Sequence, residues 1–264
     1  MIKESYKCSI DNLNKLDKSV PINLVLSGGG EKGVAHISLL EELEKRNIKI
    51  NSISACSAGS LVGSMYASGV SAKEILTFFK KTDIFQYSWL TFGKAGIFNS
   101  DNYSKLLNGK IKDTFEELSI PLYLSTTNLN KGVTHYFSEG DLRKPVLASC
   151  AVPGLFNPID INGELYSDGG ILDNFPITPF KGSEYPIIGS YVVYPSVKKN
   201  KDLSSTYKVL EHSFKLLSLS SEEYKFFKTF ATVCFPLEDY SSFDKKEVNK
   251  IYKVAKKYLN ERLK

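Results

Sequence analysis

Short apolar runs alternate with longer helical patterns along the first third of this chain. Ile22 to Leu26, apolar except for Asn23, is predicted as a buried strand, and Ile50 to Ser54 is predicted as a second strand. Apolar residues at helical spacing follow each strand, over 34–44 and 61–67. Strands that lead in turn into helices predict an α/β domain.

The remainder of the chain continues this alternation. Ser71 and Glu74 have the spacing of a capping box and predict the start of a further helix. We expect strands over 121–127, 133–137 and 187–194, and helices over 142–148 and 205–231. With 264 residues, 42% of them hydrophobic, the chain can bury one substantial core. No repeat or linker divides it, so we expect one three-layer α/β domain over 1–264, with 205–264 mainly helical.

Ser57 stands where the second predicted strand meets its helix. Almost no loop separates the two elements, and such a sharp turn can expose a serine hydroxyl above the edge of a sheet, as in a nucleophile elbow. Gly59, Gly63 and Ala67 recur every four residues, so one face of the helix is small enough to pack closely on the sheet. The alternative is a strand-to-helix turn in which serine only caps the helix.

A glycine-rich loop follows the first predicted strand, from Gly28 to Gly33. Backbone N–H groups of such a loop, at the start of a helix, favour an anion such as a phosphate or a transient oxyanion. The spacing also matches the G-x-G-x-x-G pattern of dinucleotide-binding folds. That class additionally requires an acidic residue at the end of the second strand, where this chain has Ser54, Ala55 and Cys56. An oxyanion hole therefore explains both the glycine-rich loop and the turn at Ser57, whereas a nucleotide site explains only the glycine-rich loop.

Asp168 is followed by two glycines, Gly169 and Gly170. Glycines allow a tight backbone turn, which would leave the carboxylate at the tip of a loop. Taken alone, an Asp-Gly pair is also an ordinary hairpin turn.

These three motifs together resemble the patatin-like phospholipase family, which is related to cytosolic phospholipase A2. The family pattern is a glycine-rich oxyanion loop, a G-x-S-x-G elbow and a D-G-G/A motif, in this order. The matching segments of this sequence are Gly28 to Gly33, Ala55 to Gly59 and Asp168 to Gly170. Further similar text lies at 149–156 and 173–176, and the resemblance covers about residues 20–195.

The resemblance implies a three-layer α/β/α fold with a mostly parallel central sheet, and a lipid acyl hydrolase with no cofactor and no metal. It implies that Ser57 is the nucleophile and Asp168 its partner in a Ser-Asp dyad. The oxyanion hole would lie at Gly28, Gly29 and Gly30, with the N–H groups of Gly29 and Gly30 as donors. A catalytically weak or inactive lipid-binding protein on the same fold is the alternative.

Two residues depart from the family pattern. Ala55 stands where the family usually has glycine, so a methyl group must fit beside the elbow, which a small neighbour would allow. Lys32 replaces the more frequent arginine. We expect Lys32 and Gly33 to support the oxyanion loop or to meet a phosphate head group, with an exposed lysine of no special role as the alternative. Gly59 completes the elbow.

A histidine-containing triad is the competing catalytic scheme. The chain has three histidines, His36, His135 and His212, and none lies in a motif that suggests a triad. The helical position of His36 predicts a buried, hydrogen-bonded side chain. Four scattered cysteines indicate neither a zinc site nor a disulfide framework, because their spacing matches no such pattern; they are Cys8, Cys56, Cys150 and Cys234.

Basic charge is concentrated at the C-terminal end. Residues 245–264 carry eight Lys or Arg against two Glu, a net charge of +6, whereas the whole chain carries +5. Apolar residues at helical spacing in the same segment predict a helix with one apolar and one basic face. The helix either packs on the fold with a solvated basic side or makes peripheral contact with an anionic membrane. We expect no nucleic-acid partner, because the basic charge is confined to one helix.

Two further expectations concern location and access to the site. No apolar stretch approaches the length of a signal peptide core or a membrane span, so we expect a cytoplasmic protein, with export that needs no cleaved signal left open. The aromatic segment 84–98 is predicted to pack near the acyl pocket or to form a lid. The sequence leaves the lipid class and the oligomeric state open.

Overall fold

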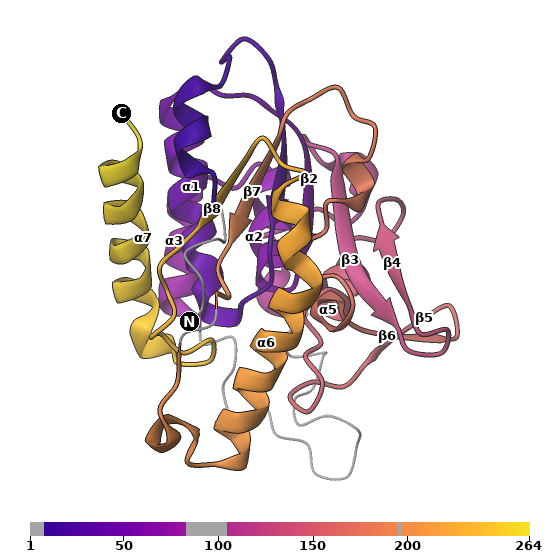
Figure 1. Cartoon of the computed structure of the whole chain (residues 1–264). Coiled ribbons are helices and arrows are strands. Elements are labelled where there is room, and N and C mark those ends of the chain that lie inside the picture. Colours follow the sequence, from indigo (N-terminus) through magenta and orange to yellow (C-terminus); the bar gives the residue numbers. More distant parts are fainter. Residues whose placement is uncertain (1–7, 83–104, 195–196) are drawn as a thin grey trace.

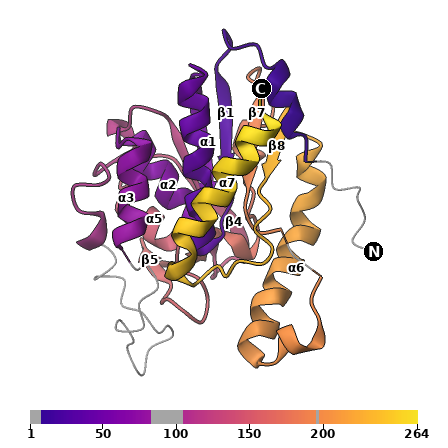
Figure 2. The same cartoon turned by 90° about the vertical axis from the view of Figure 1, so that its left-hand side faces the viewer.

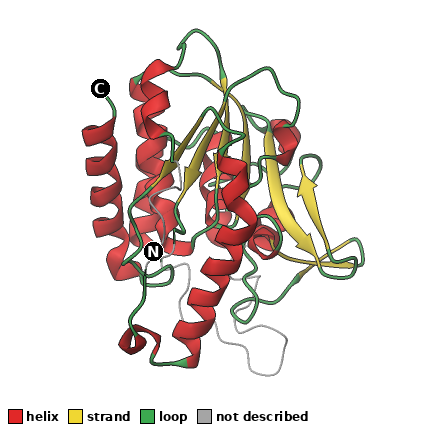
Figure 3. Ribbon diagram, viewed as in Figure 1, coloured by secondary structure: helices red, strands yellow, loops and turns green. Residues whose placement is uncertain are grey.

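The computed structural model describes residues 8–82, 105–194 and 197–264, which form a central sheet flanked by helices (Figure 1; Figure 3). The described strands are β1 (Ile22–Leu26), β2 (Ile50–Cys56), β3 (Leu122–Asn128), β4 (Val133–Phe137), β5 (Ile159–Ile161), β6 (Glu164–Asp168), β7 (Ile187–Tyr191) and β8 (Ala231–Cys234). They are ordered β5-β6-β3-β2-β1-β7-β8 across the sheet, and β4 pairs with β3.

The middle of this sheet is parallel. The pairs β1·β2, β1·β7, β2·β3 and β7·β8 are parallel, whereas β4, β5 and β6 pair in antiparallel fashion at one side. Leu26 at the end of β1 lies beside Ala55 near the end of β2. The glycine-rich loop and Ser57, which follow these two strands directly, are therefore neighbours at the same edge of the sheet. The expected α/β fold with a mostly parallel sheet is confirmed.

Helices lie on both faces of the sheet (Figure 2). The helices α2 (Ala58–Ala67) and α3 (Ala72–Lys81) lie on the opposite side of the sheet from α6 (Thr206–Phe226). Two further helices are α1 (Val34–Lys45) and the short α5 (Arg143–Ser149). The capping box predicted for α3 is present, since Ser71 Oγ accepts from the N–H of Glu74 at 3.3 Å and Glu74 Oε2 accepts from the N–H of Ser71 at 3.1 Å.

The C-terminal helix α7 (Val248–Arg262) packs on the outside of α1 (Figure 2). Its buried residues are Val248, Ile251, Ala255 and Leu259, which confirms the predicted apolar face. On the polar side, the Tyr252 hydroxyl and the Lys256 ammonium both donate to Glu41 of α1. The helix is thus a packed part of the fold with a solvated basic side.

Three strands were not predicted from the sequence. Residues 159–168 form the hairpin β5 and β6, so Asp168 is the last residue of a strand that pairs with β3, and the expectation of a loop tip is wrong. The sequence does carry a signal for this hairpin, since Asn162-Gly163 after the alternating Ile159-Asp160-Ile161 is typical of a hairpin turn. Likewise, α6 ends at Phe226 instead of 231, because 231–234 forms β8. The strand β7 ends at Tyr191, earlier than the predicted 194.

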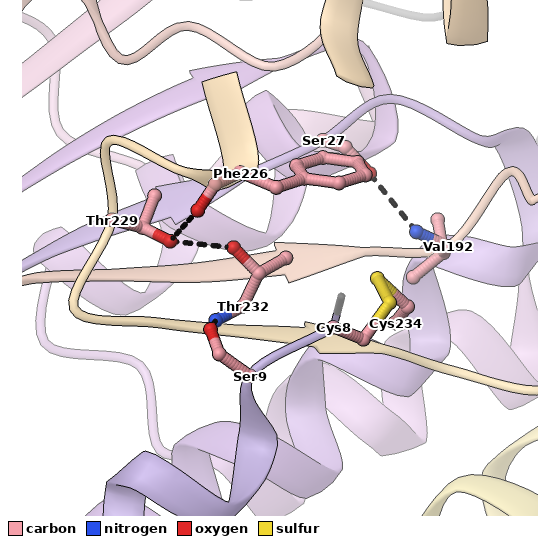
Figure 4. Close-up of a disulfide and its surroundings, with 8 residues drawn as sticks. All are labelled: Cys8, Ser9, Ser27, Val192, Phe226, Thr229, Thr232 and Cys234. Atoms are coloured by element: carbon pink, nitrogen blue, oxygen red, sulfur yellow. Dashed lines mark hydrogen bonds between the residues drawn. A yellow bond between two sulfur atoms is a disulfide. The ribbon is translucent and has the colours of Figure 1, made fainter. Parts of the chain in front are cut away.

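A disulfide joins Cys8 to Cys234, with their Cα atoms 5.7 Å apart (Figure 4). It ties the first described residue to the end of β8, beside the bond in which Ser9 Oγ accepts from the N–H of Thr232 at 3.0 Å. The expectation of no disulfide is therefore wrong for this pair. The two cysteines are 226 positions apart, so only the arrangement of the sheet brings them together.

The part of the chain that is described contains no helix long and apolar enough to cross a membrane. Residues 84–98, predicted to pack near the pocket or to form a lid, lie outside the described residues.

Candidate active site

Ser57 forms a sharp turn between β2 and α2. Its backbone has φ +51° and ψ −122°, a conformation that residues other than glycine rarely adopt. Hydrogen bonds hold this turn: the N–H of Ser57 donates to Ser149 Oγ at 2.9 Å, and Ser149 Oγ donates onward to the carbonyl of Ser125 at 2.7 Å. The Ser57 hydroxyl makes no capping bond to α2. The strained elbow is therefore present, and a serine cap is not.

Small residues let the elbow sit close to the sheet. A Cβ atom on Gly59 would clash with the carbonyl oxygens of Leu26 and Ser27. Ala55 is fully buried, and a Cβ atom on Gly63 would lie 3.5 Å from its methyl group. That distance is ordinary van der Waals contact, so the methyl group of Ala55 fits in the core beside α2 without a clash at Gly63.

The glycine-rich loop passes directly beside Ser57. A Cβ atom on Gly28 would lie 2.9 Å from Ser57 Cβ, and one on Gly33 would lie 2.6 Å from the methyl group of Ala58. The N–H of Gly28 donates to the carbonyl of Asn174 at 3.3 Å. Gly30 has φ +59°, a conformation that favours glycine. The loop is shaped by close approach to its neighbours, and the tightest position is Gly30, where a Cβ atom would clash with the carbonyl oxygen of Ser242.

Lys32 of this loop points into the protein. Its side chain is fully buried, and Nζ donates to the carbonyl of Leu237 at 2.6 Å. The alternative of an exposed lysine is wrong, whereas support of the oxyanion loop by Lys32 stays a prediction. A buried ammonium group requires such a partner, so the loop is fixed to the segment after β8.

Asp168 lies at the end of β6 and faces Ser57. Its Oδ1 accepts from the N–H of Gly170 at 2.7 Å and from the Cys56 thiol at 3.8 Å. The Ser57 hydroxyl lies near enough to lower the pKa of this carboxyl group, although Oδ2 has no partner with full hydrogen-bond geometry among the described residues. Burial outweighs these interactions and raises the pKa of Asp168 to about 6.

Ser57 and Asp168 line a pocket of about 140 Å³. Gly29 and Gly30 line the same pocket. Most of the remaining wall is apolar and is formed by Val152, Pro153, Ile171, Val193 and Phe243. Its polar residues include Lys215 and Ser218 of α6. The site thus combines a nearly buried serine, 8% exposed, a buried carboxylate and an apolar wall that suits a hydrocarbon chain.

A buried ionic network behind the Asp168 loop was not predicted from the sequence. Lys225 of α6 binds Asp173 at 2.6 Å and also pairs with Glu222, while Tyr136 donates to Asp173. The N–H of Asn174 donates to Glu222 Oε1 at 2.9 Å. Burial raises the pKa of Glu222 to about 7, although Lys225 lowers it. A Glu and a Lys three residues apart on the apolar side of a helical run were the available signal.

Replacing Lys225 with methionine is expected to destabilise the protein by about 3–5 kcal/mol, because it leaves two buried carboxylates without their cation. Urea unfolding measures the loss. Lys208→Met on the exposed side of the same helix is the matched control, and its effect should stay below about 0.5 kcal/mol. Equal effects of the two variants would contradict a structural role for the network.

The three histidines lie in separate surroundings. His36 is fully buried, with Nδ1 2.7 Å from Ser190 Oγ and Nε2 2.8 Å from the carbonyl of Ser27, as predicted. Burial lowers its pKa to about 4, so the ring is neutral near pH 7. His135 is exposed on β4, and His212 is partly buried on α6. No hydrogen bond within the described residues joins a histidine to Ser57 or Asp168.

A comparison with protein families identifies the class to which this fold and site belong. The model of the patatin-like phospholipase family matches residues 24–181, more than half of the chain. The chain therefore belongs to the patatin-like phospholipase family, as the three motifs predicted. The matched range contains the glycine-rich loop, the Ser57 elbow and Asp168.

Individual relatives agree with this placement. The chain is 33% identical over 172 residues to Lysophospholipase NTE1 of Cryptococcus neoformans, which is 61% of this chain and 10% of that protein. It is 32% identical over 211 residues to an uncharacterised protein of Acanthamoeba polyphaga mimivirus, which is 71% of this chain and 70% of that protein. The chain thus spans only about a tenth of the lysophospholipases that it matches.

One solved structure supports the fold independently of sequence. VipD from Legionella pneumophila matches 92% of this chain and 67% of its own, with a TM-score of 0.61 at 16% identity. At this identity the similarity establishes the fold alone.

Proposed function

We propose that this protein is a serine acyl hydrolase that cleaves ester-linked acyl chains of lipids through Ser57 and Asp168. The observation that carries the proposal is the strained Ser57 turn, whose hydroxyl faces a buried carboxylate inside a pocket with an apolar wall. Strain at a non-glycine residue is typical of a nucleophile elbow.

In the proposed reaction, Ser57 Oγ attacks the ester carbonyl while Asp168 takes its proton. The tetrahedral oxyanion is stabilised by the N–H groups of Gly29 and Gly30, which line the pocket, whereas Gly28 gives the room for close approach. The alcohol leaves as Asp168 returns the proton. Water then hydrolyses the acyl-enzyme with Asp168 again acting as the base.

The raised pKa of Asp168, about 6, suits this role. A carboxylate of ordinary pKa is a weak base, whereas a group that titrates near the working pH combines ionisation with affinity for the proton. The same burial that raises this pKa keeps bulk water from the pair.

Among lipids, we propose single-chain phospholipid esters as the substrate class. The proposal is supported by the apolar pocket wall and by the similarity to proteins named lysophospholipases. The experiment is a panel of lysophospholipids, diacyl phospholipids and neutral glycerides, read by mass spectrometry for free fatty acid. Wild type should release fatty acid and Ser57→Ala should not. If wild type releases none from any lipid, the alternative of an inactive lipid-binding protein replaces the proposal.

Access to such a substrate requires contact with a lipid surface, and two faces of the molecule are candidates. One is the basic side of α7, predicted from the sequence as a peripheral contact with an anionic membrane. The other is the solvent side of α6, a helix whose Lys215 and Ser218 line the pocket.

A further inference from the structure

The helix α6 has two apolar faces. Leu219 and Phe226 lie on its inner face, where the Phe226 ring packs against Phe175 and Tyr191. On the opposite face, Leu210, Leu217 and Tyr224 recur every seven residues and are exposed. A helix that only covers a sheet needs one apolar face, so the second face has no role in the described fold.

We define the outer face of α6 by its exposed apolar residues, which are Val209, Leu210, Leu216, Leu217, Tyr224 and, directly after the helix, Phe227. Leu217 is 66% exposed and Phe227 is 67% exposed. Large apolar side chains rarely gather on one solvent-facing stripe of a monomeric protein, and such a patch marks a binding surface. Figure 2 places α6 at the margin of the molecule, apart from α7.

The pocket that contains Ser57 is lined by another side of α6. Lys215 and Ser218 line that pocket, and they project about 200° and 100° around the helix from Leu217 of the outer face. Ile171 also lines it and is itself partly open to solvent. The same helix thus carries the outer face on one side and part of the pocket wall on another.

Exposed lysines lie at both ends of α6. Lys199, Lys201 and Lys208 are exposed at the N-terminal end of the helix, and Lys228 is exposed at the other end, 4.9 Å above the Tyr224 ring. The partly exposed acidic groups described nearby are Asp202, which accepts from the N–H of Lys199, and Glu223. An apolar stripe with a basic margin is complementary to an anionic lipid surface, with hydrocarbon below and negative head groups beside it.

We propose that the outer face of α6 docks on an anionic lipid surface and thereby brings the helix that forms part of the Ser57 pocket to that surface. The proposal rests on the proposed function, since only a pocket that takes lipid esters needs this placement. It assigns the interfacial role to α6 and not to α7, whose apolar residues already pack against the fold.

Vesicle flotation tests the proposal directly, with Ser57→Ala protein so that binding is measured without hydrolysis. Vesicles of phosphatidylcholine mixed with phosphatidylglycerol should bind this protein, and phosphatidylcholine alone should bind it more weakly. Adding Leu217→Asp and Phe227→Asp should lower binding at least about 10-fold, because two large apolar groups are lost from the interface. Circular dichroism checks that the variant is folded.

Matched controls separate this surface from others. Leu129→Asp with Val133→Asp changes two exposed apolar residues at the turn between β3 and β4, 46% and 48% exposed, and should leave vesicle binding unchanged. Lys250→Glu with Lys257→Glu reverses charge on α7 and should change binding less than 2-fold. The proposal is overturned if wild type does not bind vesicles, if the α6 variant binds normally, or if the α7 variant loses binding.

A second copy of the chain is the other possible occupant of the outer face. Sedimentation of wild type and of the α6 variant distinguishes a lipid surface from a second copy as the occupant. If wild type is a dimer that the α6 substitutions dissociate, and if it does not bind vesicles, the outer face is a dimer interface and the lipid proposal is rejected. Binding and catalysis remain separable. Vesicle binding without fatty acid release would support the docking surface and contradict the hydrolase. Fatty acid release without vesicle binding would support the hydrolase and contradict the docking surface.

Discussion

Replacing Ser57 with alanine is expected to lower ester hydrolysis by a factor on the order of 10⁴–10⁶, because the acyl group then has no acceptor. The loss should appear in kcat, since the pocket wall that holds the acyl chain is unchanged. Hydrolysis of a soluble chromogenic ester measures it. Ser57→Gly should be equally inactive but more stable than Ser57→Ala by about 1 kcal/mol, because glycine adopts φ +51° with less strain.

Ser64→Ala is the matched control for this loss. Ser64 lies on the same helix and donates to the carbonyl of Leu61 at 3.2 Å, away from the pocket. It should keep wild-type kcat within about 3-fold. Equal loss in both variants would mean that disruption of α2, and not removal of the nucleophile, explains the effect.

Asp168→Asn is expected to lower kcat by a factor on the order of 10⁴, because the amide cannot take the proton of Ser57. The amide oxygen can still accept from the N–H of Gly170, so the fold should survive. Asp160→Asn, an exposed carboxylate in the adjacent strand, is the control and should be fully active. Wild-type activity should fall as the pH drops through about 6, where Asp168 becomes protonated.

The same substitution should change stability with a definite sign. The pKa of Asp168 is raised on folding from 3.8 to about 6. The contribution of this group to the free energy of unfolding is therefore fully present below about pH 3.8 and is lost as the pH rises through about 6. Above that pH, wild type carries a desolvated carboxylate that costs up to about 3 kcal/mol. Asp168→Asn should therefore be more stable than wild type at pH 8 and not at pH 4. Urea unfolding at both pH values measures this, and a variant that is less stable at pH 8 would contradict the burial argument.

The sequence predicted the parts of the site that depend on local backbone chemistry. Ser57 and the glycine-rich loop each follow a strand immediately, and parallel neighbouring strands bring their ends together. The small residues Gly59 and Gly63 predicted the close packing of α2. In these cases a few adjacent residues determine the geometry.

Features that depend on distant partners were missed. Lys225 lies 52 positions from Asp173, and Cys8 lies 226 positions from Cys234, so no spacing along the chain indicates either contact. The fully buried state of Lys32 likewise follows from the carbonyl of Leu237, far away in sequence. Asp168 was identified correctly as a motif residue but was placed on a loop, because a short polar strand has no clear alternation.

The central claim, that Ser57 is the nucleophile activated by Asp168, is tested most directly by labelling with a fluorophosphonate probe and mapping the adduct by peptide mass spectrometry. The account predicts one adduct on Ser57 in wild type, slower labelling in Asp168→Asn and in wild type below pH 6, and none in Ser57→Ala. An adduct on another residue, or undiminished labelling of Ser57→Ala, would contradict it.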